Sequence, residues 1–236
     1  MATILQQCKI ARQKMRIGSP AEARATCLEI LKQQPNNLFA HRLLATMALE
    51  TGSREAMQHF QQCAAIDPQD PLAEVGQAVV AEQNRVTESA LRHFQRAAEL
   101  DPSDARIQEE LERLGGEFHE TPLAQGVAQL QSGDTAAAVE TLRDGGAGSD
   151  DVALKLTLAR ALWQRGANDQ ALVLAMQVLS THPYSIAALM FLLAAETKRG
   201  RALRVRELHM RAEAVDPGFN LHLDLANSLG LATSNK

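Results

Sequence analysis

The pattern of apolar and polar positions repeats along the chain. Three segments of 17 residues, 21–37, 54–70 and 88–104, align without gaps, and each carries an early alanine and a closing proline followed by polar residues. The pattern returns in segments 168–185 and 204–220. Each segment is predicted to be a helix that its proline terminates. The closing prolines stand 33 or 34 residues apart within each group of copies: Pro35, Pro68, Pro102, Pro183 and Pro217.

A further helix is predicted upstream of each of these segments. In most copies it ends near a glycine: Gly18, Gly52, Gly133, Gly166 and Gly200. Small residues occupy fixed places in both helices, and they let the paired helices approach to the short end of the ~8–10 Å range. In the first helix these residues are Ala11, Ala45, Ala78, Gly126 and Ala159, with Leu193 departing in the last copy. In the second helix they are Ala23, Ala56, Ala90, Ala138 and Ala171, with Val205 departing.

A repeated hairpin of this length, with small residues at these places and a proline after the second helix, resembles the tetratricopeptide repeat (TPR). The resemblance covers nearly the whole chain in about six copies. It implies an all-α fold, an α-solenoid in which the helix hairpins form a right-handed superhelix. The composition agrees, because 45% of the residues are apolar but only 3% are aromatic, which favours helices over sheets.

The spacing of the repeats also predicts how they are grouped. The small residues of the second helices follow one another at steps of 33, 34, 48, 33 and 34 residues. The long middle step contains Ile107, Leu111 and Leu114, a one-sided apolar stripe on a charged helix that is typical of a capping helix. The C-terminus offers a counterpart in Leu221, Leu225 and Leu229. We therefore predict two three-repeat blocks, 1–117 and 118–236, each with a capping helix. One continuous six-repeat superhelix is the alternative.

Charge and composition narrow the classes of partner. The formal net charge is -4 and the chain has few aromatic residues, so neither a positive field nor stacking platforms favour nucleic acid as a partner. No apolar run approaches the ~18 residues that a membrane span needs, and the N-terminus lacks the apolar core of a signal peptide. We expect no membrane insertion and a cytoplasmic protein. The three cysteines, Cys8, Cys27 and Cys63, are expected to be reduced thiols in or near the core.

Enzyme motifs are not found in the sequence. The glycine-rich segment 145–151 has no lysine and follows no strand, so we interpret it as a loop rather than a phosphate-binding site. His59 and Cys63 stand four residues apart on one helix face, but a structural zinc normally needs four ligands. Trp163 is interpreted as a packing residue. We expect no enzyme activity, no metal and no cofactor.

The resemblance also implies where a partner would bind. The first helices of stacked hairpins line the concave face, so residues near their start and middle face a ligand. By alignment we predict a partner-binding groove made of Lys9, Arg12, Phe39, Arg42, Leu72, Val75, Val79, Leu123, Val127, Leu156, Arg160, Met190 and Phe191. TPR proteins that bind the acidic tails of chaperones resemble one another in a clamp of basic and amide residues, and that clamp is absent here.

The predicted groove is mostly apolar, with basic residues at its N-terminal end. It suits an apolar or amphipathic peptide or helix of a protein partner, and the adjacent pair Met190 and Phe191 is expected to be an exposed anchor. The groove could instead be filled by the protein's own cap or by a second copy. The leading hypothesis is a non-enzymatic scaffold for protein–protein interaction. The assembly of a larger complex is a role that it would suit. The alternatives are a self-associating structural subunit and a TPR chaperone for an exported or assembled protein.

Overall fold

The computed structural model describes residues 2–146 and 149–231 and is all-α, without a strand in these ranges. The helices are α1 (Ile4–Arg16), α2 (Pro20–Gln33), α3 (Leu38–Glu50), α4 (Glu55–Ile66), α5 (Pro71–Gln83), α6 (Thr87–Leu100), α7 (Ala105–Arg113), α8 (Pro122–Gln131), α9 (Thr135–Gly145), α10 (Val152–Gln164), α11 (Asn168–Thr181), α12 (Ile186–Lys198), α13 (Ala202–Val215), the 3₁₀ helix η1 (Pro217–Phe219) and α14 (Leu223–Leu229). Consecutive hairpins of these helices pack in sequence order, so the protein is an α-solenoid, as predicted.

Local sequence signals set the ends of the helices. The predicted glycines end the first helix of their hairpins with positive φ, for example 76° at Gly18 and 86° at Gly133. The third hairpin has no glycine at this place, and Arg85 takes the left-handed conformation instead, with φ 60°. At the start of later helices, side chains such as Asn37 and Asp70 accept hydrogen bonds from backbone N–H groups of the first turn.

Small residues bring the helices of each hairpin together. Ala11, Ala78 and Ala159 are fully buried, as predicted from their places in the repeat. At Gly126 an added Cβ would lie 2.4 Å from the side chain of Leu142 on the paired helix, so only glycine fits there. Hairpin packing of this kind depends on contacts between neighbours in the sequence, and this is why a repeat pattern predicts it well.

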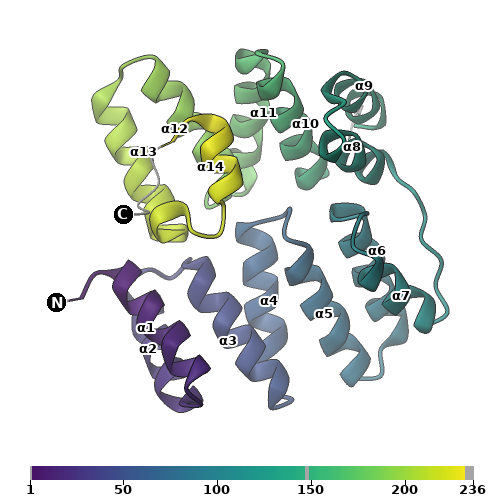
Figure 1. Ribbon diagram of the computed structural model, residues 1–236, viewed down its shortest axis with the longest axis vertical. Helices are drawn as coiled ribbons and strands as arrows, with labels where there is room; N and C mark the ends of the chain where they lie inside the picture. The colour runs from purple at the N-terminus through teal and green to yellow at the C-terminus, as the bar shows by residue number, and fades with distance from the viewer. Residues whose placement is uncertain (1, 147–148, 232–236) are drawn as a thin grey trace.

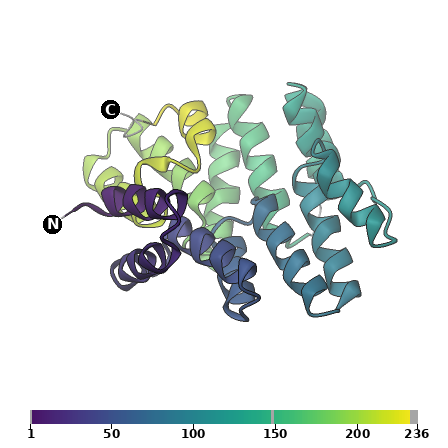
Figure 2. The same cartoon turned by 60° about the horizontal axis from the view of Figure 1, so that its bottom comes forward.

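The hairpins form two rows that face each other (Figures 1 and 2). Helices α1–α7 make one row, α8–α14 make the other, and the chain crosses between them after α7. Helix α7 covers the end of the first row, where Ile107 and Leu111 pack with Ala78 and Phe94. At the other end of the molecule, α1 lies against η1, so the rows also meet near the two termini.

The largest hydrophobic cluster contains residues of both rows. It is centred on α10, α11 and α12, and it also includes Ile66 at the end of α4 and Leu100 at the end of α6. Helix α8 contacts α6 as well. The tips of the first row therefore pack against the second row. Whether residues 1–117 and 118–236 are independent blocks stays a prediction.

The three cysteines are free and buried, as expected, and burial raises the pKa of each thiol to about 12. His59 lies against His41 rather than with Cys63, and the two Nδ1 atoms are 3.0 Å apart. Burial lowers the pKa of both imidazoles, so the neutral forms are favoured. Of the helices described, none is long and apolar enough to cross a membrane.

Candidate functional site

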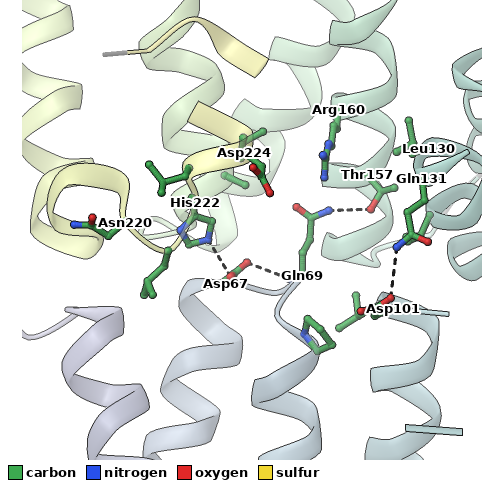
Figure 3. Close-up of a pocket in the computed structure, with 17 residues that line it drawn as sticks. Asp67, Gln69, Asp101, Leu130, Gln131, Thr157, Arg160, Asn220, His222 and Asp224 are labelled. Atoms are coloured by element: carbon green, nitrogen blue, oxygen red, sulfur yellow. Dashed lines mark hydrogen bonds and ion pairs between the residues drawn. The ribbon is translucent and has the colours of Figure 1, made fainter. Parts of the chain in front are cut away.

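A cleft of about 710 Å³ opens between the two rows. Figure 3 shows that turn residues of the first row border it on one side and helices of the second row on the other. The C-terminal residues 220–225 close one end. The lining residues are Asp67, Gln69, Pro71, Leu100, Asp101, Val127, Leu130, Gln131, Thr157, Arg160, Ala187, Asn220, Leu221, His222, Leu223, Asp224 and Leu225.

Polar side chains connect the rows at the floor of this cleft. The amide Nε2 of Gln69 donates to Thr157 Oγ1 at 2.9 Å, and Thr157 in turn donates to the carbonyl of Ala153 at 2.8 Å. A longer bond of 3.4 Å joins Gln131 Nε2 to Asp101 Oδ1. These bonds come from turns of the first row and helices of the second, so they fix the width of the cleft.

The inner wall of the second row carries both apolar and charged groups. Val127 and Leu130 of α8 are half-buried, and Arg160 of α10 is exposed. Among the residues that the structure describes, the guanidinium of Arg160 makes no ion pair and no hydrogen bond, and in Figure 3 it points into the cleft. An unpaired guanidinium beside apolar side chains can bind a carboxylate or a backbone carbonyl of a ligand.

A buried charge network closes the end of the cleft near the termini. His222 Nε2 lies 3.0 Å from Asp67 Oδ2 in the α4–α5 turn, and His222 Nδ1 lies 2.9 Å from Asp216 Oδ2. Arg42 of α3 pairs with Asp70 at 2.7 Å and reaches Asp67 at 3.6 Å. Two carboxylates thus hold one imidazolium between the second and the last repeats.

The electrostatics of this network favour the charged histidine. Burial alone would lower the pKa of His222, but the charge of Asp67 and the hydrogen bonds to both carboxylates raise it to about 9. Burial disfavours the ionised form of Asp67, yet the neighbouring His222 and Arg42 lower the pKa of its carboxyl. The two groups are therefore an ion pair at neutral pH.

The predicted groove residues do not form one continuous surface. Val127 and Arg160 line the cleft, whereas Lys9, Arg12 and Phe39 border a separate small pocket against the C-terminal segment. Arg42 and Leu72 border a third hollow between α3 and α5. Val75 and Val79 are half-buried and pack against the cluster around Phe94. The guanidinium of Arg12 lies 5.1 Å from the ring centre of Phe39.

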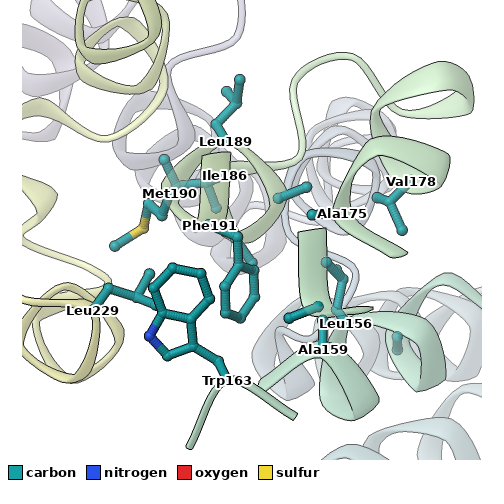
Figure 4. Close-up of a cluster of buried hydrophobic side chains, with 14 of the residues drawn as sticks. Leu156, Ala159, Trp163, Ala175, Val178, Ile186, Leu189, Met190, Phe191 and Leu229 are labelled. Carbon is teal, nitrogen blue, oxygen red and sulfur yellow. The ribbon is translucent and has the colours of Figure 1, made fainter. Parts of the chain in front are cut away.

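Five of the predicted groove residues are buried, and the expectation that Met190 and Phe191 form an exposed anchor is wrong for this structure. Met190 and Phe191 are 0% and 1% exposed, Leu123 and Leu156 are 2% and 0% exposed, and Phe39 is 9% exposed. Figure 4 shows Leu156, Met190 and Phe191 within the core of the second row. The ring of Phe191 lies 5.7 Å from that of Trp163, which is itself a packing residue as predicted.

The sequence did not indicate several residues of the cleft. Gln69 and Asp101 belong to turns between repeats, and His222 and Asp224 belong to the C-terminal segment. The one available signal was the dipeptide Asp-Pro, which begins at Asp67, at Asp101 and again at Asp216. No group of three or more histidines, cysteines or acidic residues that could hold a metal ion occurs within residues 2–146 and 149–231.

Comparison with known proteins gives distant likenesses only. No protein-family model matches the chain, and no curated protein matches it. PilF of Pseudomonas aeruginosa is similar in structure, with a TM-score of 0.40, 14% sequence identity and coverage of 89% of this chain and 90% of that one. PilW, a widely conserved type IV pilus biogenesis factor, is similar with a TM-score of 0.39, 16% identity and coverage of 96% of each chain.

Proposed function

We propose that this protein is a non-enzymatic scaffold that binds a segment of a protein partner in the cleft between its two rows of helices. The observation that carries the proposal is the open cleft of about 710 Å³, in which the unpaired Arg160 lies on the same wall as Val127 and Leu130. The lining combines eight apolar residues with nine polar or charged ones, so a bound segment would make polar contacts as well as apolar ones.

The shape of the cleft favours an extended or short helical segment as the occupant. The side-chain amides of Gln69, Gln131 and Asn220 each donate one hydrogen bond within the protein, and their second N–H groups and their oxygens can pair with the backbone of a bound chain. Half-buried Val127 and Leu130 offer contacts for one or two apolar side chains. The partner would therefore bind through a short stretch of its chain, with an acidic or carbonyl group at Arg160.

Affinity capture from the native cell tests the proposal. The bait is the full chain, and the variants are Val127→Asp and Arg160→Glu, which change the wall of the cleft at residues that are not fully buried. The matched control is Arg92→Glu, an exposed position of α6 outside the lining of the cleft. We expect both cleft variants to lose a partner that the wild type and the control retain, with helicity unchanged. Equal capture by all four proteins would refute the proposal.

A self-associating structural subunit is the second candidate function, and one observation favours it. Four large apolar side chains of α11 and α13 are exposed: Val173 by 49%, Met176 by 54%, Leu203 by 87% and Met210 by 58%. Exposed apolar residues on neighbouring helices are typical of protein interfaces. Sedimentation across a range of concentrations would show association in the wild type and a monomer for Leu203→Glu if this candidate is correct.

A further inference from the structure

The C-terminal segment that contains Leu221 and His222 packs against the first row. Leu221 packs against the hydrophobic cluster of α1, α2 and α3, which includes Cys8 and Phe39. The next residue, His222, reaches Asp67 at 3.0 Å although 155 positions separate them in the sequence. One apolar side chain and one cation are thus placed side by side on the N-terminal end of the first row.

The receiving surface needs a cation. Asp67 and Asp70 are 7% and 5% exposed, and Arg42 is the one guanidinium within residues 2–146 and 149–231 that pairs with them. Asp216, at the end of α13, adds a third carboxylate that faces His222. Without His222, Asp67 would keep only Arg42 at 3.6 Å and the backbone N–H of Gln69 at 3.3 Å. A buried carboxylate with such partners favours a second positive charge.

The segment fills the apolar part of this surface incompletely. Leu221 is only half-buried, and a pocket of about 40 Å³ remains beside it. The pocket is bordered on the first row by Leu5, Cys8, Lys9, Arg12 and Phe39. A larger apolar side chain would therefore bury more surface here than leucine does.

The backbone of the segment is held at a conformational cost. Gly218 and Phe219 have φ of 71° and 52°, and a left-handed conformation is unfavourable for phenylalanine. This turn precedes Leu221, which packs against the first row, and His222, which reaches Asp67. A separate chain would make the same two side-chain contacts without the cost of that turn.

We infer that this end of the first row is a binding site for a partner segment in which a bulky apolar residue is followed by a cationic one, and that Leu221 and His222 occupy it in the free protein. The inference rests on the proposed function, because it supplies the chemistry of the partner at the end of the cleft that residues 220–225 close. Cys8, Phe39 and Asp67 are the receiving residues. A partner with this pattern displaces residues 220–222.

The experiment measures binding of a labelled peptide, Gly-Phe-Asn-Trp-Lys-Leu-Asp, to the full chain by fluorescence anisotropy. The wild type is compared with the double variant Leu221→Ser/His222→Ala, in which the site is vacated. We expect at least tenfold tighter binding to the double variant. Adding Asp67→Asn to it, or replacing the lysine of the peptide by glutamate, is expected to remove that gain.

The reactivity of Cys8 provides a second readout at the site. Cys8 is 6% exposed and borders the pocket beside Leu221, whereas Cys27 is fully buried within its cluster. In the double variant Cys8 is expected to react at least tenfold faster with a thiol reagent, and the peptide is expected to slow it again. Cys27 is the internal control, and His222→Gln serves as the variant if the double variant loses helicity.

Three results would overturn the inference. The first is a folded variant whose Cys8 stays as unreactive as in the wild type, since the segment would then not cover the site. The second is a reactive Cys8 that the peptide does not protect. The third is a wild-type dimer that the peptide leaves intact, with no peptide bound to either protein, which would assign the site to a second copy. Failure of the proposed function can be told apart from these results. Val127→Asp and Arg160→Glu test the cleft, and they are expected to leave the reactivity of the Cys8 thiol unchanged.

Discussion

Arg96 of α6 holds Asp151, the residue that caps the N-terminus of α10, through two hydrogen bonds of 2.7 and 2.8 Å. Asp151 also accepts hydrogen bonds from the backbone N–H groups of Ala153 and Leu154. The same carboxylate therefore starts a helix of the second row and joins it to the first. Burial disfavours its charge, but Arg96 and the backbone donors lower the pKa of Asp151 overall.

This double role predicts different costs for two substitutions. Asp151→Asn keeps an oxygen that can cap α10 but weakens the pair with Arg96, and we expect it to lower the free energy of unfolding by about 1.5 kcal/mol. Asp151→Ala loses the cap as well, at a further cost of about 1 kcal/mol. Urea unfolding followed by circular dichroism measures both. Equal losses for the two variants would show that Asp151 does not cap α10.

The His222 ion pair predicts a loss of stability in mild alkali. The pKa of His222 is about 9 in the folded protein and 6.5 in the unfolded chain. Its contribution is fully present below pH 6.5 and is lost as the pH rises to about 9, because only the folded state keeps the proton in that range. The free energy of unfolding is therefore expected to fall by on the order of 3 kcal/mol.

His222→Gln is the control for this pH dependence, since glutamine does not titrate. Unfolding of both proteins in urea is measured at intervals from pH 6.5 to pH 9. Burial lowers the pKa of His41 and of His59, so these histidines change the free energy of unfolding mainly below pH 6.5 and not between pH 6.5 and pH 9. The buried thiols add a smaller loss near pH 9 in both proteins, because the unfolded chain releases their protons first. A wild-type profile no steeper than that of the variant would be inconsistent with the buried ion pair.

The burial of Phe191 predicts a core defect rather than a binding defect on substitution. Phe191→Ala would leave a cavity beside Trp163, and losses for such changes are about 3–5 kcal/mol. Phe191→Leu keeps most of the volume and is expected to cost much less. Thermal and urea unfolding of both variants measure this difference. If Phe191→Ala is as stable as the wild type, the side chain is not in the core.

The repeat pattern predicted the hairpins because their signals are local. Helices α2 and α4 end just before Pro35 and Pro68, because a proline cannot continue a helix. Gly18 follows the end of α1 in the left-handed conformation. Small residues such as Ala78 mark close helix contacts between neighbours in the chain. Each of these signals acts within one repeat, so the chain reveals them without knowledge of the tertiary structure.

The cleft could not be predicted in the same way, because it depends on contacts between distant residues. Gln69 and Thr157 are 88 positions apart, and Asp67 and His222 are 155 apart. The predicted groove assumed that every first helix exposes the same face, but in the second row that face meets other helices and the tips of the first row. Phe191 is buried for this reason, whereas Arg160 on the same row stays exposed.

The division into two blocks remains a prediction with a direct test. Ile107 and Leu111 cover the apolar surface around Phe94, so a fragment of residues 1–117 is expected to fold alone. It is expected to be less stable than the full chain, because it lacks the bonds that Gln69 and Arg96 make to the second row. Circular dichroism and thermal unfolding of the purified fragment measure this, and a soluble but unfolded fragment would favour one continuous superhelix.

The most direct test of the proposed scaffold is site-specific photo-cross-linking in the native cell. A photoreactive phenylalanine analogue replaces Val127 or Arg160 in the cleft, and a third protein carries it at Arg92 on the exposed face of α6. We expect one protein partner to be cross-linked at both cleft positions and not at the control position, with the adduct mapping to a short segment of that partner. Adducts at Arg92 alone, or none at either cleft position from a folded protein, would contradict the account.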